Sequence, residues 1–318
     1  MTILRDDDIA HLLTYGKVIP VMEGLLRSKR GDNVVHPPRY ILPTEGGSLT
    51  FTVGEVIDKN VAGFRFYGSP KTTQLTVAVD TQSGEFKGLI IGTLIGVIRT
   101  ACLNAVAIKY LARQDAQTLG VLGSGLQARH HALAALEVRD FKALRLYSRD
   151  PANAEACRHF IEARLPRGGV DISIEKSPED LLRACDVLIS ATNSSTPILS
   201  AKDLRPGLHI NNVGPKYSHK HELPQEAYDL ADILTTDSIP QLFDTTGIGA
   251  ALCTKGLERG ELMGLEHYMS GFERRPEDIT FFCSMGLAGS EVALADWVIE
   301  ALKAEGHSGV YAALVAEP

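Results

Sequence analysis

Short apolar runs alternate with helical segments in the second half of the chain. Runs such as TLGVL and VLIS are almost continuously apolar, as in strands that are buried on both faces of a sheet. The predicted strands span residues 118–122, 143–147, 170–174, 187–190, 208–213 and 232–236. Strands that alternate with helices predict a doubly wound parallel sheet, which is the Rossmann type of α/β fold.

A different pattern fills the first part of the chain. Residues 1–30 have a helical pattern with acidic residues in a first turn, and residues 34–80 hold short β-branched and aromatic runs bounded by Gly, Pro and Ser. TQSGEFKG then predicts a hairpin turn, and TACLNAVAIKYLA has helical spacing. We therefore expect a separate α+β domain. A last helix is predicted at residues 290–304, and its pattern does not decide which domain it joins.

Composition narrows the classes of function. The chain has 318 residues with 44% apolar and 22% charged residues, enough for two domains, and a net charge of -7 that disfavours nucleic acid and anionic membranes as partners. Five scattered cysteines without a CxxC pair argue against a disulfide framework and a metal site, and predict reduced thiols in the cytoplasm. No run reaches 18 uninterrupted apolar residues. Chemistry on a small molecule is the favoured class.

The segment VLGSGLQARHH follows a predicted strand and begins a helix. Gly123, Gly125 and Ala128 form a GxGxxA pattern, in which the first glycine permits a tight turn, the second lets a pyrophosphate approach the backbone, and the alanine lets the helix pack closely. Leu126 and Gln127 complete the predicted cofactor loop. This context predicts a dinucleotide site, and the alternative is a strand–helix turn without a ligand.

The end of the next strand, LYSRDP, bears on the choice of cofactor. If Ser148 and Arg149 face the ribose, a 2′-phosphate is accommodated and NADP(H) is favoured; if Asp150 does, NAD(H) is favoured. We expect NADP(H). Thr192 and Ser194 follow a later strand, at the edge of the sheet where cofactors bind, although a role as turn or helix caps is the alternative.

Several stretches resemble the ornithine cyclodeaminase and mu-crystallin family of imine-reducing and amine-oxidising enzymes. They are PPR at 37–39, GVIRTA at 96–101, YLARQDAQTLGVLGSGLQARHH from 110, NNVGPK from 211, TTDS from 235 and DITFFCSMGLAGSEVALA from 278. The resemblance implies a split, homodimerising substrate domain (1–113 and 290–318) and a Rossmann domain (114–289), with hydride transfer in the cleft between them.

The resemblance also implies which residues form the site. Arg39, Arg65 and Arg99 would hold a substrate carboxylate, since guanidinium groups bind carboxylates in a bidentate manner. Arg65 stands where the family has a Lys, which puts in doubt any role of that position as a proton donor. The matching stretches add Thr100, Val213 and Gly286 to the predicted cofactor site, with Gly286 near the nicotinamide.

The segment VGPKYSHKHEL gathers lysines and histidines directly after a predicted strand. Lys216 stands where ornithine cyclodeaminases have an Asp that serves the substrate amine, so it would instead suit an anion such as a second substrate carboxylate. His221, or less favourably His219, would supply a proton, because imidazole titrates near neutral pH. A solvated basic loop without chemistry is the alternative for both Lys216 and His221.

Together with the glycine turn, the resemblance implies an NAD(P)H-dependent reductase of an imino or cyclic imino acid, with iminosuccinate among the candidates, or the reverse dehydrogenase. Two alternatives stay open at this point. One is a cyclodeaminase that recycles NAD internally, and the other is a non-catalytic, NADP-gated small-ligand-binding protein.

Overall fold

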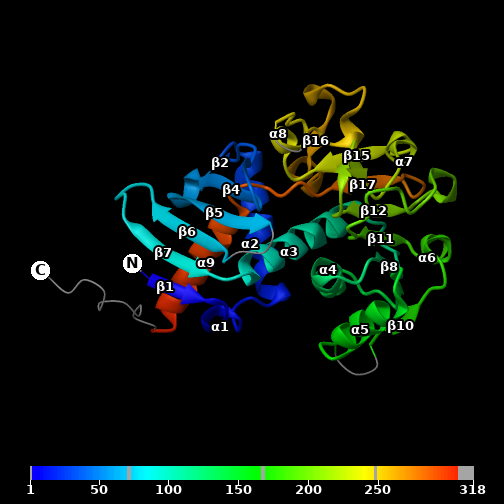
Figure 1. The fold of residues 1–318 in the computed structure, drawn as a ribbon, viewed down its shortest axis with the longest axis horizontal. Coiled ribbons are helices and arrows are strands. Elements are labelled where there is room, and N and C mark those ends of the chain that lie inside the picture. The colour runs from blue at the N-terminus through cyan, green and yellow to red at the C-terminus, as the bar shows by residue number, and fades with distance from the viewer. Residues whose placement is uncertain (1, 70–72, 166–168, 247–248, 307–318) are drawn as a thin grey trace, which may run out of the picture. The chain divides into compact units, whose positions relative to one another are not determined.

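The computed structural model describes residues 2–69, 73–165, 169–246 and 249–306 (Figure 1). The chain forms two compact units, Met1–Arg99 with Gly286–Pro318, and Thr100–Met285. The boundary lies inside helix α3 (Leu94–Leu111), whereas the sequence analysis placed it after that helix. The start of α3 is tied to the first unit because the Asp6 carboxylate accepts hydrogen bonds from Thr93 N (2.8 Å) and Leu94 N (3.1 Å).

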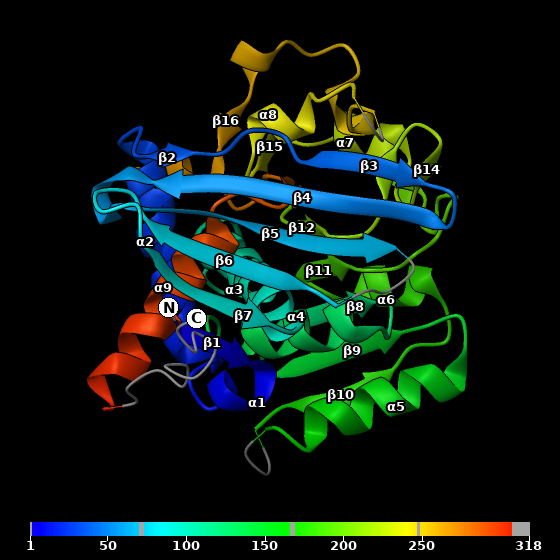
Figure 2. The same cartoon turned by 60° about the vertical axis from the view of Figure 1, so that its left-hand side comes forward.

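The first unit is built on a mainly antiparallel sheet of seven strands among the described residues (Figure 2). The strands are β1 (Thr2–Arg5), β2 (Val34–Val35), β3 (Tyr40–Thr44), β4 (Gly47–Val56), β5 (Val61–Ser69), β6 (Leu75–Asp80) and β7 (Phe86–Ile91), in the order β1-β7-β6-β5-β4-β2 with β3 also paired to β4. Residues 2–5 were expected to be helical but form a strand parallel to β7, because tertiary pairing outweighs their local pattern. The acidic residues 6–8 do begin a helix, α1 (Asp6–Ile9).

Two longer helices belong to this unit, α2 (Tyr15–Arg30) and α9 (Ser290–Ala304). Helix α9 packs on β4 to β7 and against α2, so the last helix joins the antiparallel sheet, a choice that its own pattern left open. Almost all of its residues from Ser290 to Val298 are buried. Burial of this helix over the sheet therefore makes α9 part of the core of the first unit.

The second unit contains a parallel sheet of eight strands in the described part of the chain (Figure 1). The strands are β8 (Thr118–Leu122), β9 (Ala143–Tyr147), β10 (Asp171–Ile174), β11 (Val187–Ser190), β12 (His209–Asn212), β15 (Ile233–Thr236), β16 (Met263–Gly264) and β17 (Thr280–Cys283). Their order is β10-β9-β8-β11-β12-β17-β15-β16, and all ladders are parallel. The doubly wound Rossmann fold is confirmed, with its topological switch between β8 and β11.

Helices and a small hairpin complete the second unit. They are α4 (Leu126–Leu136), α5 (Pro151–Glu162), α6 (Pro178–Ala184), α7 (Gln225–Asp229), α8 (Ile239–Leu242) and the hairpin of β13 (Lys216–Tyr217) with β14 (Lys220–His221). Strand β17 was not predicted from the sequence; it lies between β12 and β15 in the sheet. Helix α3 is long and apolar enough to cross a membrane by length and composition, but 78% of it is buried inside the structure, as in a core helix.

Candidate active site

Three predicted arginines converge in the first unit. Arg39 lies between β2 and β3, Arg65 lies on β5, and Arg99 lies on α3. Arg39 and Arg99 meet at Gly286, whose φ of 89° suits glycine: a Cβ atom there would lie 3.2 Å from Arg39 Nη2 and 3.6 Å from Arg99 Nη1. Arg65 joins Arg99 through the carboxylate of Glu291. Chain segments that are far apart in the sequence thus bring these guanidinium groups together.

Arg65 is held firmly in this cluster, with only 8% of the residue exposed. Its Nη1 donates to Glu291 Oε1 (3.3 Å), its Nη2 donates to Gln74 Oε1 (2.5 Å), and its guanidinium lies 4.6 Å from the centre of the Tyr67 ring. Arg39 Nη1 donates to the same tyrosine hydroxyl (3.3 Å). Burial, reinforced by the nearby charge of Arg99, lowers the pKa of Arg65 in spite of Glu291.

Glu291 neutralises part of this charge. Its Oε1 lies 2.7 Å from Arg99 Nη2 and also accepts from Arg65, and the residue is only 1% exposed. Burial by itself would raise the pKa of Glu291, but Arg99 and Arg65 bring it below its usual value. Glu291 was not predicted as a site residue, because a glutamate in the first turn of a helix is common and is favourable there without any other role.

Arg65 and Arg99 share the carboxylate of Glu291, and the guanidinium group of Arg39 lies in the same cluster. Each guanidinium group has five N–H donors, so it can bind an anion in addition to a neighbouring carboxylate. Guanidinium groups match the planar geometry of a carboxylate. The cluster can therefore bind a small carboxylic acid.

The predicted glycine turn connects β8 to α4. Gly123 has a φ of 115°, and a Cβ atom there would collide with the carbonyl group of Ala191, so this turn needs glycine. Gly125 has no atom within 4 Å of its Cβ position, while Ala128 is fully buried against the sheet. Leu126 and Gln127 form the first turn of α4, whose N–H groups can bind an anion. The open space at Gly125 fits the close approach of a pyrophosphate.

The residues after β9 have distinct contacts. Ser148 follows the strand directly, and its Oγ lies 2.9 Å from Ser124 Oγ in the glycine turn. Arg149 is exposed. Asp150 is the N-cap of α5 and accepts a hydrogen bond from Ala152 N (2.9 Å). Ser148 is therefore adjacent to the turn, whereas the carboxylate of Asp150 is engaged at a helix end.

Thr192 and Val213 lie just past the ends of β11 and β12, and both contact buried charges of the 213–223 segment. Thr192 N and Oγ1 donate to Glu222 Oε2 (2.9 and 2.8 Å). Lys216 Nζ donates to the carbonyl oxygens of Val213 (3.3 Å), Gly214 (2.7 Å) and Ser284 (3.0 Å). Thr100 lies on α3 at the start of the second unit. Its carbonyl oxygen accepts a hydrogen bond from Asn104 Nδ2 (2.9 Å).

The contacts of Lys216 differ from those that the sequence analysis expected. The residue is only 3% exposed, and its ammonium group, which has three N–H donors, reaches three backbone carbonyls in the described structure. Burial lowers the pKa of Lys216. No donor is left for a second substrate carboxylate, so the expectation that this lysine binds an anion is not supported.

Glu222 was not predicted as part of the site, because it belongs to no recognisable motif. Its carboxylate accepts the two hydrogen bonds from Thr192.

His221 is half-buried on β14, paired with Lys216 across the hairpin. Its Nδ1 lies 3.1 Å from the carbonyl oxygen of Tyr217. A proton on Nδ1 satisfies that carbonyl, so Nε2 is an acceptor when the ring is neutral and a donor when the ring is protonated. His219 is exposed and stacks on Tyr217.

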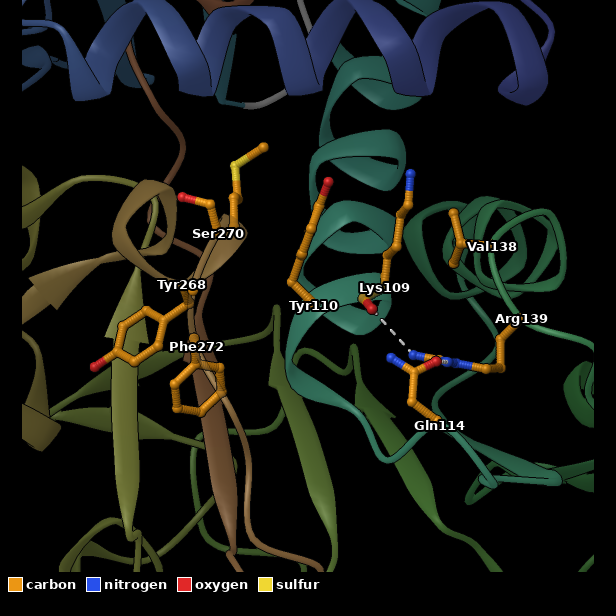
Figure 3. Close-up of a pocket in the computed structure, with 10 residues that line it drawn as sticks. Lys109, Tyr110, Gln114, Val138, Arg139, Tyr268, Ser270 and Phe272 are labelled. Atoms are coloured by element: carbon orange, nitrogen blue, oxygen red, sulfur yellow. Dashed lines mark hydrogen bonds between the residues drawn. The ribbon is translucent and has the colours of Figure 1, made fainter.

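A cavity of about 440 Å³ lies elsewhere in the second unit (Figure 3). It is lined by residues that include Lys109, Tyr110, Gln114, Arg139 and Tyr268. These residues precede β8, β9 and β17, so the cavity lies at the amino edge of the parallel sheet, opposite to the glycine turn. Arg139 is engaged there, donating to Gln114 Oε1 (2.6 Å) and to the carbonyl oxygen of Lys109 (3.1 Å). Arg139 therefore caps the end of α3.

Comparison with known proteins identifies the family of the chain. Residues 3–306 match the sequence model described as the ornithine cyclodeaminase/mu-crystallin family. A Delta(1)-pyrroline-2-carboxylate reductase from Bacillus cereus is 32% identical, with 96% of this chain and 98% of the relative covered. The structure of the Thermococcus litoralis Delta(1)-pyrroline-2-carboxylate reductase, in complex with NADH and L-proline, has a TM-score of 0.87 at 25% identity and 96% and 98% coverage.

The fold is also that of the iminosuccinate reductase of Paracoccus denitrificans, solved with NAD+. This structure has a TM-score of 0.85 at 23% identity, and covers 96% of this chain and 97% of its own.

Proposed function

Because the chain belongs to the ornithine cyclodeaminase/mu-crystallin family, we propose that it is an NAD(P)-dependent oxidoreductase that reduces the C=N bond of a small imino acid to give an L-amino acid, or catalyses the reverse dehydrogenation. The observation that carries the proposal is the cluster of Arg39, Arg65 and Arg99 around Glu291 and Gly286, in a chain that also has a dinucleotide-type glycine turn.

The substrate is a cyclic imino acid with one carboxylate. The relatives from Bacillus cereus and Thermococcus litoralis are named for Delta(1)-pyrroline-2-carboxylate, which has this chemistry. Arg39, Arg65 and Arg99 bind and orient its carboxylate. The donors of Lys216 are already engaged, which disfavours a dicarboxylate such as iminosuccinate. The same lysine offers no carboxylate to a substrate amine, which disfavours a cyclodeaminase.

The backbone of Gly123, Gly125, Leu126 and Gln127 would hold the cofactor, with Thr100, Thr192 and Val213 toward its nicotinamide half, and the family resemblance adds Gly286. When bound, it supplies the hydride that is added to the imine carbon. We propose NADP(H) rather than NAD(H), because Ser148 and Arg149 follow β9 next to the glycine turn while Asp150 caps α5.

His221 or a water molecule supplies the proton to the imine nitrogen. The support for His221 is its half-buried place on the hairpin and the contact of its Nδ1 with Tyr217 O, which orients the ring. Arg65 is excluded from this role because a guanidinium group keeps its proton.

We also propose a homodimer that forms through the sheet of the first unit. Along β5, Arg65 points to the α9 side, so Phe64 points to the opposite face. On that face an apolar groove is lined by residues that include Val35, Val53, Phe64 and Val79. A second copy of the chain would cover this groove. The substrate domain of this proposal is 1–113 with 290–318 and the cofactor domain is 114–289, so the proposed functional boundary follows α3, whereas the compact units divide within α3.

A cytoplasmic location is proposed on the ground that all five cysteines are free and buried.

Purified protein incubated with NADPH or NADH and Delta(1)-pyrroline-2-carboxylate, a six-membered cyclic imino acid, iminosuccinate, or pyruvate with ammonia tests the activity. We expect cofactor oxidation with the cyclic imino acids and formation of the corresponding L-amino acid. Cofactor binding without oxidation by any of these compounds would indicate a binding protein and refute the proposal.

A further inference from the structure

Two buried charged residues tie together the strand ends of the second unit. Lys216 is 3% exposed and joins the end of β12, through Val213 O and Gly214 O, to the end of β17, through Ser284 O. Each of these carbonyls lies within 3.3 Å of Nζ. The ammonium group thus links two neighbouring strands at their carboxyl ends.

Glu222 does the same for the next pair of strands. Glu222 is 0% exposed. Its Oε2 accepts hydrogen bonds from Thr192 N and Oγ1, just after β11. Its Oε1 accepts hydrogen bonds from Asn212 Nδ2 (2.7 Å) and Gly214 N (2.9 Å), at the end of β12. The position of Gly214 leaves no room for a side chain, because a Cβ atom would collide with the Glu222 carboxylate. The carboxylate therefore links β11 to β12.

The opposite charges of Lys216 and Glu222 stabilise each other electrostatically. Burial lowers the pKa of Lys216 and raises that of Glu222, and the opposite charge of each residue counters the shift of the other. Polar groups that are buried in such a network are costly unless every partner is in place. The network is thus a rigid support for three adjacent strands, β11, β12 and β17.

We propose that Lys216 and Glu222 are positioning residues that hold Thr192, Val213 and the end of β17 in the arrangement that binds the nicotinamide half of the cofactor. This inference rests on the proposed function, and on the rule that ligands of open α/β sheets bind at the carboxyl ends of the strands. The adenine half depends instead on the glycine turn after β8 and on the end of β9. The two halves of the cofactor should therefore respond differently to changes in the network.

The test compares two ligands in titrations of the full chain. One is NADPH or NADH, whichever the wild type binds more tightly, and the other is the matching ADP-ribose, with or without the 2′-phosphate, which lacks the nicotinamide. Glu222→Gln places an amide donor against groups that already donate, and Lys216→Met removes the ammonium group. We expect the Kd of the whole cofactor to rise at least about 10-fold in both variants, and that of ADP-ribose to stay within about 2-fold.

Tyr228→Phe is the matched control. Its hydroxyl donates to Asn212 Oδ1 (2.9 Å), so the variant perturbs the same buried network without touching Lys216 or Glu222. We expect lower thermal stability with an unchanged ratio of the two Kd values. If Glu222→Gln does not fold, Glu222→Asp is the second variant, because it keeps the charge but has a shorter side chain. It should raise the Kd of the whole cofactor more than that of ADP-ribose.

The outcomes separate the two proposals. A wild-type chain that binds neither NADPH nor NADH refutes the proposed function itself. A wild type that binds cofactor, with variants that bind both ligands as the wild type does or lose both equally, overturns the positioning role alone.

Discussion

Arg99 and Glu291 form a buried ion pair, with 2.7 Å between Nη2 and Oε1. Arg65 Nη1 lies 3.3 Å from the same carboxylate oxygen, so one negative charge is shared between two guanidinium groups. Arg39 adds a third guanidinium group near Gly286, so the N–H donors of three arginines gather in one cluster. Guanidinium groups match the planar geometry of a carboxylate, which is the physical basis for expecting an anionic substrate.

Replacing Arg39 with Met should weaken substrate binding while the fold is retained. Arg39 is half-buried and contacts the Tyr67 hydroxyl, whereas Arg65 and Arg99 are paired to Glu291. A hydrogen bond to a charged group is worth about 1.5–3 kcal/mol, so KM for the imino acid should rise about 10- to 150-fold. Steady-state kinetics check this, with Lys17→Met, an exposed change on α2, as control. An unchanged KM for Arg39→Met would place the carboxylate elsewhere.

The two glycines of the cofactor turn should respond differently to Ala. Gly125 has φ −72° and open space at its Cβ position, so Gly125→Ala should leave the stability of the free protein within about 1 kcal/mol of wild type. It should nevertheless weaken cofactor binding, because the methyl group occupies the space of the pyrophosphate. Gly123→Ala should lower the melting temperature, since its φ is 115° and its methyl group meets Ala191.

Thermal melts with and without cofactor measure both effects. Gly24→Ala, in helix α2 with no atom within 4 Å of its Cβ position, is the control and should change neither cofactor affinity nor the added stability that cofactor gives. Wild-type cofactor affinity in Gly125→Ala would argue against a pyrophosphate at this turn.

Cofactor preference should depend on Arg149. If the 2′-phosphate faces Ser148 and Arg149, Arg149→Ala should raise the Kd of NADPH about 10-fold or more and leave that of NADH within about 2-fold. Fluorescence titration with both nucleotides measures this. Arg183→Ala, an exposed change on α6, serves as control. An unchanged preference in Arg149→Ala would show that another residue selects the cofactor.

Stability should fall between neutral and acidic pH because of His209. Burial, together with the nearby charge of Arg274, lowers the pKa of this histidine to about 3. Its nitrogens contact Thr280 Oγ1 (2.8 Å) and Asn211 Oδ1 (2.9 Å) and are satisfied when the ring is neutral. The unfolded chain takes up a proton below about pH 6.5, whereas the folded chain does not until about pH 3, so stability is lost as pH decreases through this window.

Urea unfolding at pH values from 7.5 to 5 measures the effect. His209→Asn should have a shallower dependence of the free energy of unfolding on pH, by up to about 1.4 kcal/mol per pH unit, which corresponds to one proton. His159→Asn, at an exposed position on α5, should keep the wild-type slope. Equal slopes in His209→Asn and wild type would mean that His209 is not the group responsible.

Association of two copies should depend on the apolar groove of the first unit. Val53 is 46% exposed in this groove, so Val53→Glu should convert the dimer to a monomer, because a charge would be buried at the interface. Light scattering after size-exclusion chromatography gives the mass. Leu230→Glu changes a residue in the second unit that is 49% exposed, and should leave the dimer intact. A Val53→Glu protein that keeps the wild-type mass would exclude this face.

Most of the fold could be predicted from local pattern. The strands from β8 to β12, together with β15, lie within a residue or two of their predicted positions, and α9 spans the predicted residues 290–304. Apolar runs and helical spacing are local properties, which explains this agreement. The prediction of a helix at residues 2–5 was wrong, because these residues form β1, and β17 was not predicted. Both strands form by pairing with strands that are distant in the sequence.

The residues of the candidate site also fall into those that could be predicted from the sequence and those that could not. The glycine turn could be predicted since its spacing, its strand and its helix are contiguous, and the arginines were proposed from family resemblance. Glu291 and Glu222 could not be predicted, because each acquires its role from partners far away in the chain, such as Arg65 and Thr192. Lys216 shows the same limit: its residue type suggested an anion, but its environment surrounds it with carbonyl oxygens.

By itself, therefore, the sequence determined the class of fold and the glycine turn, since these depend on residues that are neighbours along the chain, and family resemblance indicated the kind of chemistry. Only the tertiary structure decided which partners each buried charge has. The physical reason is that the state and the role of a buried charge depend on its desolvation and on its partners in space.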